Sequence, residues 1–311
     1  MYVPPKKETA EALSPRIGRS ARWIMTRTGV ETRHVSEEPM EVMAAHAARE
    51  ALGCGSPPDL ILNASTTPRQ FIPDSSTYIM KELGLDGVAG FSVHATCLSF
   101  LAALQVASGA IATGTAKRVL IVSAEVGTRS RNFKNPESAA LFGDGAAAAV
   151  VEATPQGEKS AILSWRMKTW PEGADLTEIR GGGLRCHPND PNTTPDDNLF
   201  RMDGPGVYRM AQKHLPALLE DVCCEAGVSM KDFDLVIPHQ ASGPALASAA
   251  KYGVEAARLV NIIGSYGNCV AASLPMAVAV AVRERRLERG KLVLLVGTGA
   301  GLSIGAAVLR W

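Results

Sequence analysis

The sequence has few aromatic residues, almost no excess charge and no apolar run long enough to span a membrane. Aromatic residues make up 5% of the 311 residues, and the formal net charge is +1 at pH 7. Because nucleic acids require a strongly basic surface, we expect no nucleic-acid partner. The long apolar stretch over residues 270–282 is shorter than the ~20 residues that a membrane-spanning helix needs. We therefore expect a soluble protein with no membrane contact.

Cysteine is scarce, and its pattern argues against two common uses. The six cysteines lack the paired spacing of a zinc site, so we expect no metal. The chain is also too long to be a small disulfide-stapled domain, and several cysteines lie in apolar segments. Residues 1–7 lack the apolar core of a signal peptide. Free thiols are typical of a reducing compartment, so the sequence predicts a cytoplasmic protein.

The chain does contain a regular alternation of short β-rich apolar runs with longer Ala-rich helical runs. This alternation is typical of an α/β protein with a mostly parallel sheet and crossover helices. The order of elements occurs twice, beginning with the strands 59–65 and 234–240. Chance similarity between α/β units is the alternative explanation. The repeat predicts two related halves, residues 1–155 and residues 156–311.

Three polar residues at strand-to-helix junctions indicate acyl transfer through a thioester. Cys97 precedes an apolar helix, whose positive end and free N–H groups favour a nucleophilic thiolate. His239 ends a strand, at the edge where α/β sheets bind ligands. Asn268 lies at the junction that we match to Cys97, and its amide could donate to a carbonyl oxygen. The alternatives are a structural cysteine and a helix-capping Asn turn; His94 is interpreted as strand packing or a pocket wall.

Two glycine-rich segments have less specific patterns. The turn Gly297-Thr298-Gly299-Ala300-Gly301 resembles a dinucleotide-binding motif, but Leu302 stands where the third glycine is required and no helix can follow. We interpret its backbone N–H groups as one side of an oxyanion hole, with the N–H of Cys97 as the other. The Gly/Pro/Asn-rich stretch 181–198 predicts a surface loop, which is either a connector or a cover for a substrate entrance.

With these residues assembled, the chain resembles the thiolase-fold condensing enzymes of the β-ketoacyl-acyl-carrier-protein synthase III type. The resemblance implies a thiolase fold, in which two βαβαβαββ halves form a five-layered αβαβα sandwich. It extends from about residue 23 to residue 311. It rests on six ordered motifs, namely Arg22-Trp23-Ile24-Met25-Thr26-Arg27-Thr28-Gly29-Val30, the segment around Cys97, Phe142-Gly143-Asp144-Gly145-Ala146, Pro238-His239-Gln240-Ala241, Gly267-Asn268 with Ala271-Ala272-Ser273, and the C-terminal glycine turn.

This resemblance implies a decarboxylative Claisen condensation with no cofactor other than the coenzyme A of the substrate. Cys97 would take an acyl group from acyl-CoA. His239 and Asn268 would then hold a malonyl thioester, expected to be malonyl-acyl carrier protein, while it loses carbon dioxide. The carbanion would attack the acyl-Cys97 carbonyl, whose oxygen would accept the N–H groups of Cys97 and Ala300.

The resemblance also implies contacts with partners. Trp23 and Arg27 match positions that contact the coenzyme A nucleotide, and Arg209 matches a basic residue that docks acyl carrier protein. Enzymes of this type are homodimers, with the segment 71–73 reaching towards the partner's pocket.

Two departures from the family pattern concern partners and the first strand. Ser242-Gly243-Pro244 stands where the family usually carries Asn and, two positions on, Arg, which removes one pantetheine contact and one contact to carrier protein. The family's first apolar strand is absent before Tyr2. We therefore expect the first half to lack a central strand, either because the start has been assigned too late or because Met1 is an internal residue.

Two further departures concern the acyl pocket. Gly127 stands where a bulky aliphatic residue often closes it, and Ile72 stands where a large aromatic often lies, so we expect a primer larger than acetyl. Arg129 could meet a terminal carboxylate on the acyl chain, with an exposed arginine as the alternative. Glutaryl, the primer that some relatives use to begin pimelate synthesis for biotin, is therefore one candidate.

Related activities fit less well. A thiolase would need a second cysteine in residues 290–311, and a hydroxymethylglutaryl synthase would need a glutamate in residues 66–71; neither is present. Two alternatives stay open. One is a non-decarboxylating acyltransferase of secondary metabolism, which passes its acyl group to an alcohol or amine, and the other is a non-catalytic partner subunit.

Overall fold

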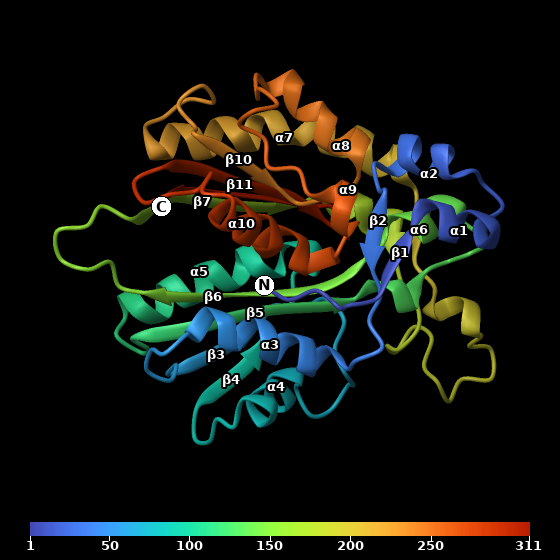
Figure 1. The fold of residues 1–311 in the computed structure, drawn as a ribbon, viewed down its shortest axis with the longest axis horizontal. Helices are drawn as coiled ribbons and strands as arrows, with labels where there is room; N and C mark the ends of the chain where they lie inside the picture. The colour runs from blue at the N-terminus through green and yellow to red at the C-terminus, as the bar shows by residue number, and fades with distance from the viewer.

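The computed structural model describes residues 1–311, and two four-stranded sheets stacked with helices form its body (Figure 1). The first sheet has the order β4-β3-β5-β6 and the second the order β10-β11-β12-β7. The strands of these sheets are β3 (Leu60–Asn63), β4 (Ala89–Ser92), β5 (Arg118–Val126), β6 (Asp144–Glu152), β7 (Ala161–Thr169), β10 (Leu235–Pro238), β11 (Leu292–Gly299) and β12 (Ser303–Arg310).

The helices lie in three layers around the two sheets (Figure 1). Helices α5 and α10 run between the sheets, α3 and α4 cover the outer face of the first sheet, and α7 and α8 cover the second. The α-helices are α1 (Ala10–Ile17), α2 (Ala21–Thr28), α3 (Met40–Leu52), α4 (Ser75–Leu83), α5 (Ser99–Ala112), α6 (Pro136–Leu141), α7 (Gly204–Ala226), α8 (Gly243–Ala247), α9 (Ile263–Tyr266) and α10 (Ser273–Arg283). This is the predicted five-layered αβαβα sandwich of the thiolase fold.

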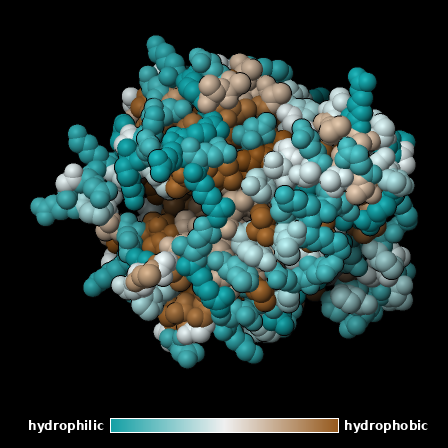
Figure 2. Space-filling model, in the orientation of Figure 1, coloured by the Kyte–Doolittle hydropathy of each residue, from teal (hydrophilic) through white to brown (hydrophobic).

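Small residues explain why two helices fit between the sheets. A core cluster of 28 buried residues fills this central layer, and it includes Ala103 and Ala107 of α5 and Ala277 and Ala281 of α10. Hydrophilic side chains cover most of the outer face, and hydrophobic residues show mainly between them (Figure 2). No helix in the chain combines the length and apolar character needed to cross a membrane.

The two sheets repeat the same register, which fixes how the halves correspond. Leu60 pairs in parallel with Val119 in the first sheet, as Leu235 does with Val293 in the second. Beyond each sheet, a short 3-10 turn precedes the central helix: η1 (Thr96–Leu98) before α5 and η6 (Val270–Ala272) before α10. Both turns begin on a non-glycine residue with positive φ, 51° at Thr96 and 46° at Val270.

This correspondence corrects the predicted match between Cys97 and Asn268. The turns align Cys97 with Ala271, and Asn268 aligns with His94 instead. The prediction was wrong because equal strand spacing cannot reveal a turn that differs by a few residues in length. Asn268 therefore reaches the same region from a loop position rather than from the first turn of the helix.

The halves differ at both sheet edges. In the first sheet β4 pairs with β3, whereas beside the matching strand β10 there is only an isolated bridge between Val236 and Leu259. In the second sheet, β7 pairs with β12 along its whole length. At the matching edge of β6, the first sheet has only an isolated bridge between Tyr2 and Ala146. The chain around this bridge continues into the short strands β1 (Lys7–Thr9) and β2 (Thr32–His34), which pair with each other beside α1 and α2. The remaining small strands, β8 (Thr177–Glu178) and β9 (Arg201–Met202), also form a pair. The proposed boundary at residue 155 lies between β6 and β7.

Candidate active site

Cys97 lies on a turn that the local sequence holds open towards solvent. The hydroxyl of Ser99 accepts a hydrogen bond from the N–H of Ala95 at 3.0 Å and donates to the carbonyl of Thr96 at 2.7 Å. These bonds tie the two ends of the turn together and help to offset the strained positive φ of Thr96. Cys97 is therefore fixed just before the first residue of α5, with its side chain only partly buried.

The glycine turn at the end of β11 packs directly against the Cys97 turn. A Cβ atom at Gly299 would lie 2.6 Å from the hydroxyl oxygen of Thr96. A Cβ atom at Gly297 would lie 2.8 Å from the Cβ of His239. Any side chain at these two positions would push the strand end away. The glycines thus allow the backbone of the second half to reach the cysteine of the first.

Burial dominates the electrostatics of Cys97 in the resting protein. Burial, and after it the negative charge of Glu125, raises the pKa of the Cys97 thiol to about 12, although hydrogen bonds from the N–H groups of Ala300 and Cys97 lower it. The predicted resting thiolate is therefore wrong, because desolvation outweighs the helix terminus. The two N–H groups that lower the pKa are those of the predicted oxyanion pair, Cys97 and Ala300.

His239 is a neutral imidazole at the end of β10. The main-chain N–H of His239 donates to the main-chain carbonyl of Val296 at 2.8 Å, which fixes the residue beside β11. The side chain is buried, and its Nδ1 has no hydrogen-bond partner. Burial lowers the pKa of His239 to about 4, so the ring is uncharged at neutral pH. A neutral ring carries one N–H, which it can donate to a carbonyl oxygen.

Asn268 is held in one orientation by its own loop. Its Oδ1 accepts the N–H of Val270 at 2.8 Å, and its Nδ2 donates to the carbonyl of Ala241 at 3.2 Å. Because Nδ2 carries two hydrogens, one N–H remains free for a ligand. The main chain of Asn268 also pairs with the segment that follows α6, through its N–H to Leu141. The amide is thus preorganised as a donor without carrying charge.

One cavity of about 1240 Å³ joins these groups. Cys97, His239 and Asn268 all line it, together with residues 297–301 of the glycine turn. The cavity continues along the inner side of α7, past Ala211 and Leu215. Such a volume exceeds the ~300–1,000 Å³ typical of a small-ligand pocket. It has room for a long, flexible ligand rather than a small one.

The structure brings some of the other predicted residues to the cavity. Gly127 and Arg27 both line it, and so does His94, which agrees with a pocket wall. Arg27 also forms an ion pair with Glu137, with Nε and Oε1 2.8 Å apart. The predicted loop contributes Gly181, Gly182 and Asn198 to the lining, so it covers part of the cavity rather than only connecting strands.

Two predicted pocket residues do not reach the cavity of this chain. Arg129 is exposed on the turn after β5, so it cannot meet a ligand that is bound at Cys97. Ile72 is 78% exposed, and its neighbour Phe71 lines the cavity instead. Arg129 therefore takes the exposed alternative, whereas Ile72 belongs to the segment expected to reach the partner's pocket and stays a prediction.

Two further predicted contact residues lie outside the cavity. Trp23 is partly buried on α2, where the guanidinium of Arg19 lies 5.6 Å from its ring. Arg209 is exposed on α7, as a docking residue would be. The structure contains no cluster of three or more His, Cys, Asp or Glu side chains that could hold a metal ion.

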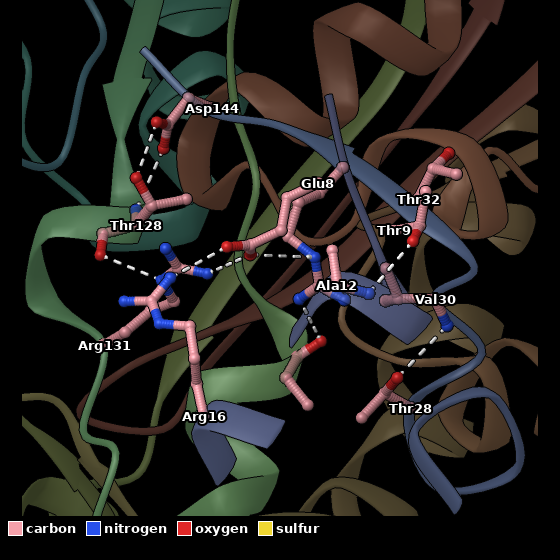
Figure 3. Close-up of polar contacts among 12 residues, drawn as sticks. Glu8, Thr9, Ala12, Arg16, Thr28, Val30, Thr32, Thr128, Arg131 and Asp144 are labelled. Atoms are coloured by element: carbon pink, nitrogen blue, oxygen red, sulfur yellow. Dashed lines mark hydrogen bonds and ion pairs between the residues drawn. The ribbon is translucent and has the colours of Figure 1, made fainter. Parts of the chain in front are cut away.

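A buried ion network holds the turn that contains Gly127 (Figure 3). Thr128 donates to Asp144 through both its N–H and its hydroxyl, at 2.9 and 2.7 Å. Arg131 donates to the carbonyl of Thr128 and forms an ion pair with Glu8, which also pairs with Arg16 (Figure 3). The N-terminal strand β1 thus helps to fix one wall of the cavity.

Sequence reasoning missed one residue, Glu125. It lies fully buried in β5, and its carboxylate accepts hydrogen bonds from the N–H groups of Thr66 and Thr67. Burial raises the pKa of Glu125 to about 7. An acidic residue inside the apolar strand 118–126 was a visible signal, because such residues are rarely buried without a purpose.

Comparisons with known proteins agree with this geometry. Residues 91–171 match the family model described as 3-oxoacyl-[acyl-carrier-protein (ACP)] synthase III, and residues 223–311 match the model for its C-terminal part. The chain is 36% identical to the beta-ketoacyl-[acyl-carrier-protein] synthase III of Erythrobacter litoralis, over 99% of this chain and 96% of the relative.

Solved structures show the same similarity. The 3-oxoacyl-[acyl-carrier-protein] synthase III of Aquifex aeolicus superposes with a TM-score of 0.90 at 32% identity, covering 100% of this chain and 97% of that one. The corresponding enzyme of Pseudomonas aeruginosa gives a TM-score of 0.90 at 30% identity, with 100% and 95% covered.

Proposed function

The chain belongs to the 3-oxoacyl-acyl-carrier-protein synthase III family of acyl-transferring condensing enzymes, and we propose that it joins an acyl group larger than acetyl to a malonyl unit carried on acyl carrier protein. The primer would arrive as acyl-CoA and become a thioester on Cys97. One observation carries the proposal: Cys97, His239 and Asn268 line a single cavity beside the N–H of Ala300.

In the first step, the Cys97 sulfur attacks the thioester carbonyl of acyl-CoA. The carbonyl oxygen takes up negative charge and accepts the N–H groups of Cys97 and Ala300, which act as an oxyanion hole. The thiol proton passes to the imidazole of His239 and from there to the departing thiolate of coenzyme A. A thioester on Cys97 is left, and no net charge has been created in the buried site.

In the second step, the thioester carbonyl of the malonyl unit accepts hydrogen bonds from His239 and Asn268. The bond to the carboxylate breaks, carbon dioxide leaves, and the remaining electron pair is stabilised as an enolate by the two donors. The carbanion attacks the acyl carbon, and the Cys97 sulfur leaves as a thiolate and takes up one proton from solvent. The neutral state of His239, which follows from its lowered pKa, suits this donor role.

The size of the primer is argued from Gly127. A Cβ atom there would lie 3.2 Å from Cγ2 of Val270 and 3.4 Å from a ring carbon of Phe142, so a larger residue would crowd these two side chains, which also line the cavity. The glycine lets both side chains stay packed against the wall of a cavity of about 1240 Å³. We therefore propose a primer with an alkyl chain of several carbons.

A glutaryl primer, and with it a step in biotin synthesis, is the less favoured form of this proposal. Its terminal carboxylate would need a cation, and Arg27 is the only lysine or arginine that lines the cavity. Arg27 is already paired with Glu137. The lining therefore favours an uncharged chain end over a carboxylate.

Partners and compartment belong to the same proposal. Phe71 and Ile72 are 79% and 78% exposed, which is unusual for two adjacent large apolar residues and supports a homodimer that covers them. Trp23 and Arg27 are proposed to contact coenzyme A, and Arg209 to dock acyl carrier protein. All six cysteines are free thiols, which supports a cytoplasmic enzyme.

Intact-protein mass spectrometry tests the acyl-enzyme. The wild type, Cys97→Ala and Cys269→Ala are incubated with acetyl-, hexanoyl- and glutaryl-CoA. Cys269 is a matched control because it is buried and does not line the cavity. We expect the strongest adduct with hexanoyl-CoA in the wild type and in Cys269→Ala, and none in Cys97→Ala. An adduct that survives Cys97→Ala would contradict the assignment of the nucleophile.

Release of carbon dioxide separates condensation from simple acyl transfer. Acylated enzyme is mixed with labelled malonyl-acyl carrier protein, and both carbon dioxide and the 3-oxoacyl product are measured. Equal amounts of the two are expected. Acyl transfer to an alcohol or amine without carbon dioxide would instead support the non-decarboxylating acyltransferase.

A further inference from the structure

The cavity has a branch that the reaction described above does not use. This branch follows the inner side of α7, where Tyr208, Ala211, Leu215 and Leu219 all line it. Their spacing of three and four residues places them on one face of the helix. Tyr208 and Leu219 are eleven residues apart, so the branch follows the helix for about 16 Å at a rise of 1.5 Å per residue.

The floor of the branch is the outer face of the second sheet. Val236 and Pro238 of β10 line it, and so do their register partners on β11, Leu294 and Val296. Residues two apart on a strand share a face of the sheet. Ile237, which lies between the two lining residues of β10, packs in the central core instead. The four lining side chains therefore point away from the central helices.

The second wall of the branch is the segment 243–254, which contains α8 and the 3-10 helix η5 (Ser248–Tyr252). Helices α7 and α8 lie on the same side of the second sheet (Figure 1). Helix α7 packs on β7 and β12, so this segment covers the neighbouring strands β10 and β11. It contributes the small residues Ala245 and Ala249 to the lining. Such short side chains leave the space beneath α7 open.

The lining of the branch is uncharged. Leu219, Met230 and Val254 line its far end and pack in one hydrophobic cluster. The acidic and basic residues that line the cavity lie on α2, α6 and β8 instead, namely Arg27, Glu137 and Glu178. A carboxylate or an amine would lose its hydration in the branch without gaining a partner of opposite charge. A hydrocarbon chain is therefore the ligand that suits it.

The branch opens beside a group that holds the extender in the reaction described above. Pro238 and Val296 belong to its floor. Pro238 directly precedes His239, and the carbonyl of Val296 accepts the main-chain N–H of His239 at 2.8 Å. Gly127, which borders the primer in that reaction, follows β5 in the first half of the fold. The two acyl units that are joined would thus each have a space of their own.

We propose that this branch binds an alkyl chain on C2 of the extender, the carbon between its two carbonyl groups, so that the enzyme accepts 2-alkylmalonyl thioesters. The inference rests on the condensation proposed above. The carboxylate leaves as carbon dioxide, and its bonding electrons stay on C2, which keeps its hydrogen and its alkyl chain. C2 then bonds to the acyl carbon, while the Cys97 sulfur leaves as a thiolate and takes up one proton from solvent. The product is a 2-alkyl-3-oxoacyl thioester.

The test gives hexanoyl-acylated enzyme three extenders: malonyl-, butylmalonyl- and octylmalonyl-acyl carrier protein. Carbon dioxide release and the mass of the product are measured. Leu215→Trp fills the branch, and Ala217→Trp is the matched control, because Ala217 is exposed on the same helix and does not line the cavity. We expect kcat/KM for octylmalonyl relative to malonyl to fall by about 10- to 200-fold in Leu215→Trp. In Ala217→Trp this ratio should follow the wild type.

The outcomes separate this inference from the proposed function. If the wild type uses malonyl but rejects both substituted extenders, the inference fails alone; if it rejects all three, the proposed condensation fails as well. The same ratio in Leu215→Trp and in the wild type would also overturn the inference. Acylation by hexanoyl-CoA relative to acetyl-CoA is measured on the same variants. A fall in that ratio alone would place the primer in the branch instead of the extender, which would contradict the proposal.

A second variant covers the case in which Leu215→Trp does not fold. Leu215→Ala widens the branch, so kcat/KM for dodecylmalonyl relative to malonyl should rise several-fold above that of the wild type. An unchanged ratio would show that Leu215 does not border the alkyl chain, and the proposal would fail.

Discussion

A methyl group added to Gly299 would lie 2.6 Å from the hydroxyl oxygen of Thr96, closer than two such atoms can approach. The two residues belong to different halves of the fold, and the contact joins the glycine turn to the Cys97 turn. This close approach allows the N–H of Ala300 to reach the Cys97 sulfur. The catalytic geometry therefore depends on the absence of a side chain.

Gly299→Ala should separate these turns. We expect acylation of Cys97 to slow by about 100-fold, since a shift of ~1 Å in a catalytic group has effects of that size. The matched control is Gly183→Ala, because a Cβ atom there meets nothing within 4 Å and its backbone has no positive φ. Acylation is followed by mass spectrometry. Equal rates in the two variants would contradict the argument.

Asn268→Ala should uncouple the two steps of the reaction. Acylation of Cys97 uses the two N–H groups of the oxyanion hole and the imidazole of His239 but not the amide of Asn268, so the acyl adduct should still form. Loss of one enolate donor should lower carbon dioxide release from the malonyl thioester by about 100- to 1,000-fold. The control is Asn192→Ala, because Asn192 is exposed and does not itself line the cavity. A parallel loss of acylation would place Asn268 in the first step instead.

Gly127→Leu should select against long primers. The added side chain would crowd Val270 and Phe142, which line the cavity, and should displace them into it. We expect kcat/KM for hexanoyl-CoA to fall by about 10- to 200-fold, while acetyl-CoA is little affected. The measurement is the ratio of kcat/KM for hexanoyl-CoA to kcat/KM for acetyl-CoA. If both fall equally, Gly127 does not border the acyl chain.

His239 should make the protein less stable in acid. Its pKa is lowered to about 4 by burial, whereas an unfolded chain has a His pKa near 6.5, so between these values only the unfolded state binds the proton. The contribution of the neutral His239 to the free energy of unfolding is complete above about pH 6.5. It falls by about 3 kcal/mol as the pH drops to about 4. Urea unfolding between pH 4 and pH 7 compares the wild type with His239→Gln, which should lack this part of the pH dependence. His187→Gln, on an exposed loop, should retain it.

Glu8→Gln should destabilise the cavity wall from a distance. Glu8 pairs with the buried Arg131, and its carboxylate lies 3.8 Å from the buried Arg33 (Figure 3 shows Arg131 and Glu8). Removing one partner of a buried ion pair leaves uncompensated charge and typically costs about 3–5 kcal/mol. The control is Glu37→Gln, whose pair with Lys6 is exposed and should contribute little to stability. Chemical denaturation, which gives the free energy of unfolding, distinguishes Glu8→Gln from Glu37→Gln.

The fold and the centre of the site could be predicted from the sequence because both depend on local patterns. Strand and helix periods repeat twice along the chain, and Cys97 and His239 each lie after a strand, whereas Asn268 follows the short helix α9. The glycine turn at 297–301 could also be interpreted as a source of N–H groups. Each of these inferences needs only neighbouring residues and the parallel arrangement of the strands.

Other features were beyond such patterns. The orientation of Arg129 and of Ile72 depends on how a loop packs, and the match of Cys97 to Ala271 depends on two short turns. The same holds for the pKa of Cys97, which the helix terminus alone predicted to be low. In the folded protein, burial and the charge of Glu125 raise it to about 12.

The sequence by itself therefore determined which chemical groups this protein has and that Cys97 and Asn268 lie just before the central helices. Only the tertiary structure decided how those groups are charged and which of them share a cavity. The reason is physical: periodicity is a property of neighbouring residues, whereas desolvation and electrostatic coupling depend on atoms brought together from distant parts of the chain. Glu125 and Cys97, 28 residues apart in the sequence, influence each other only because the chain folds.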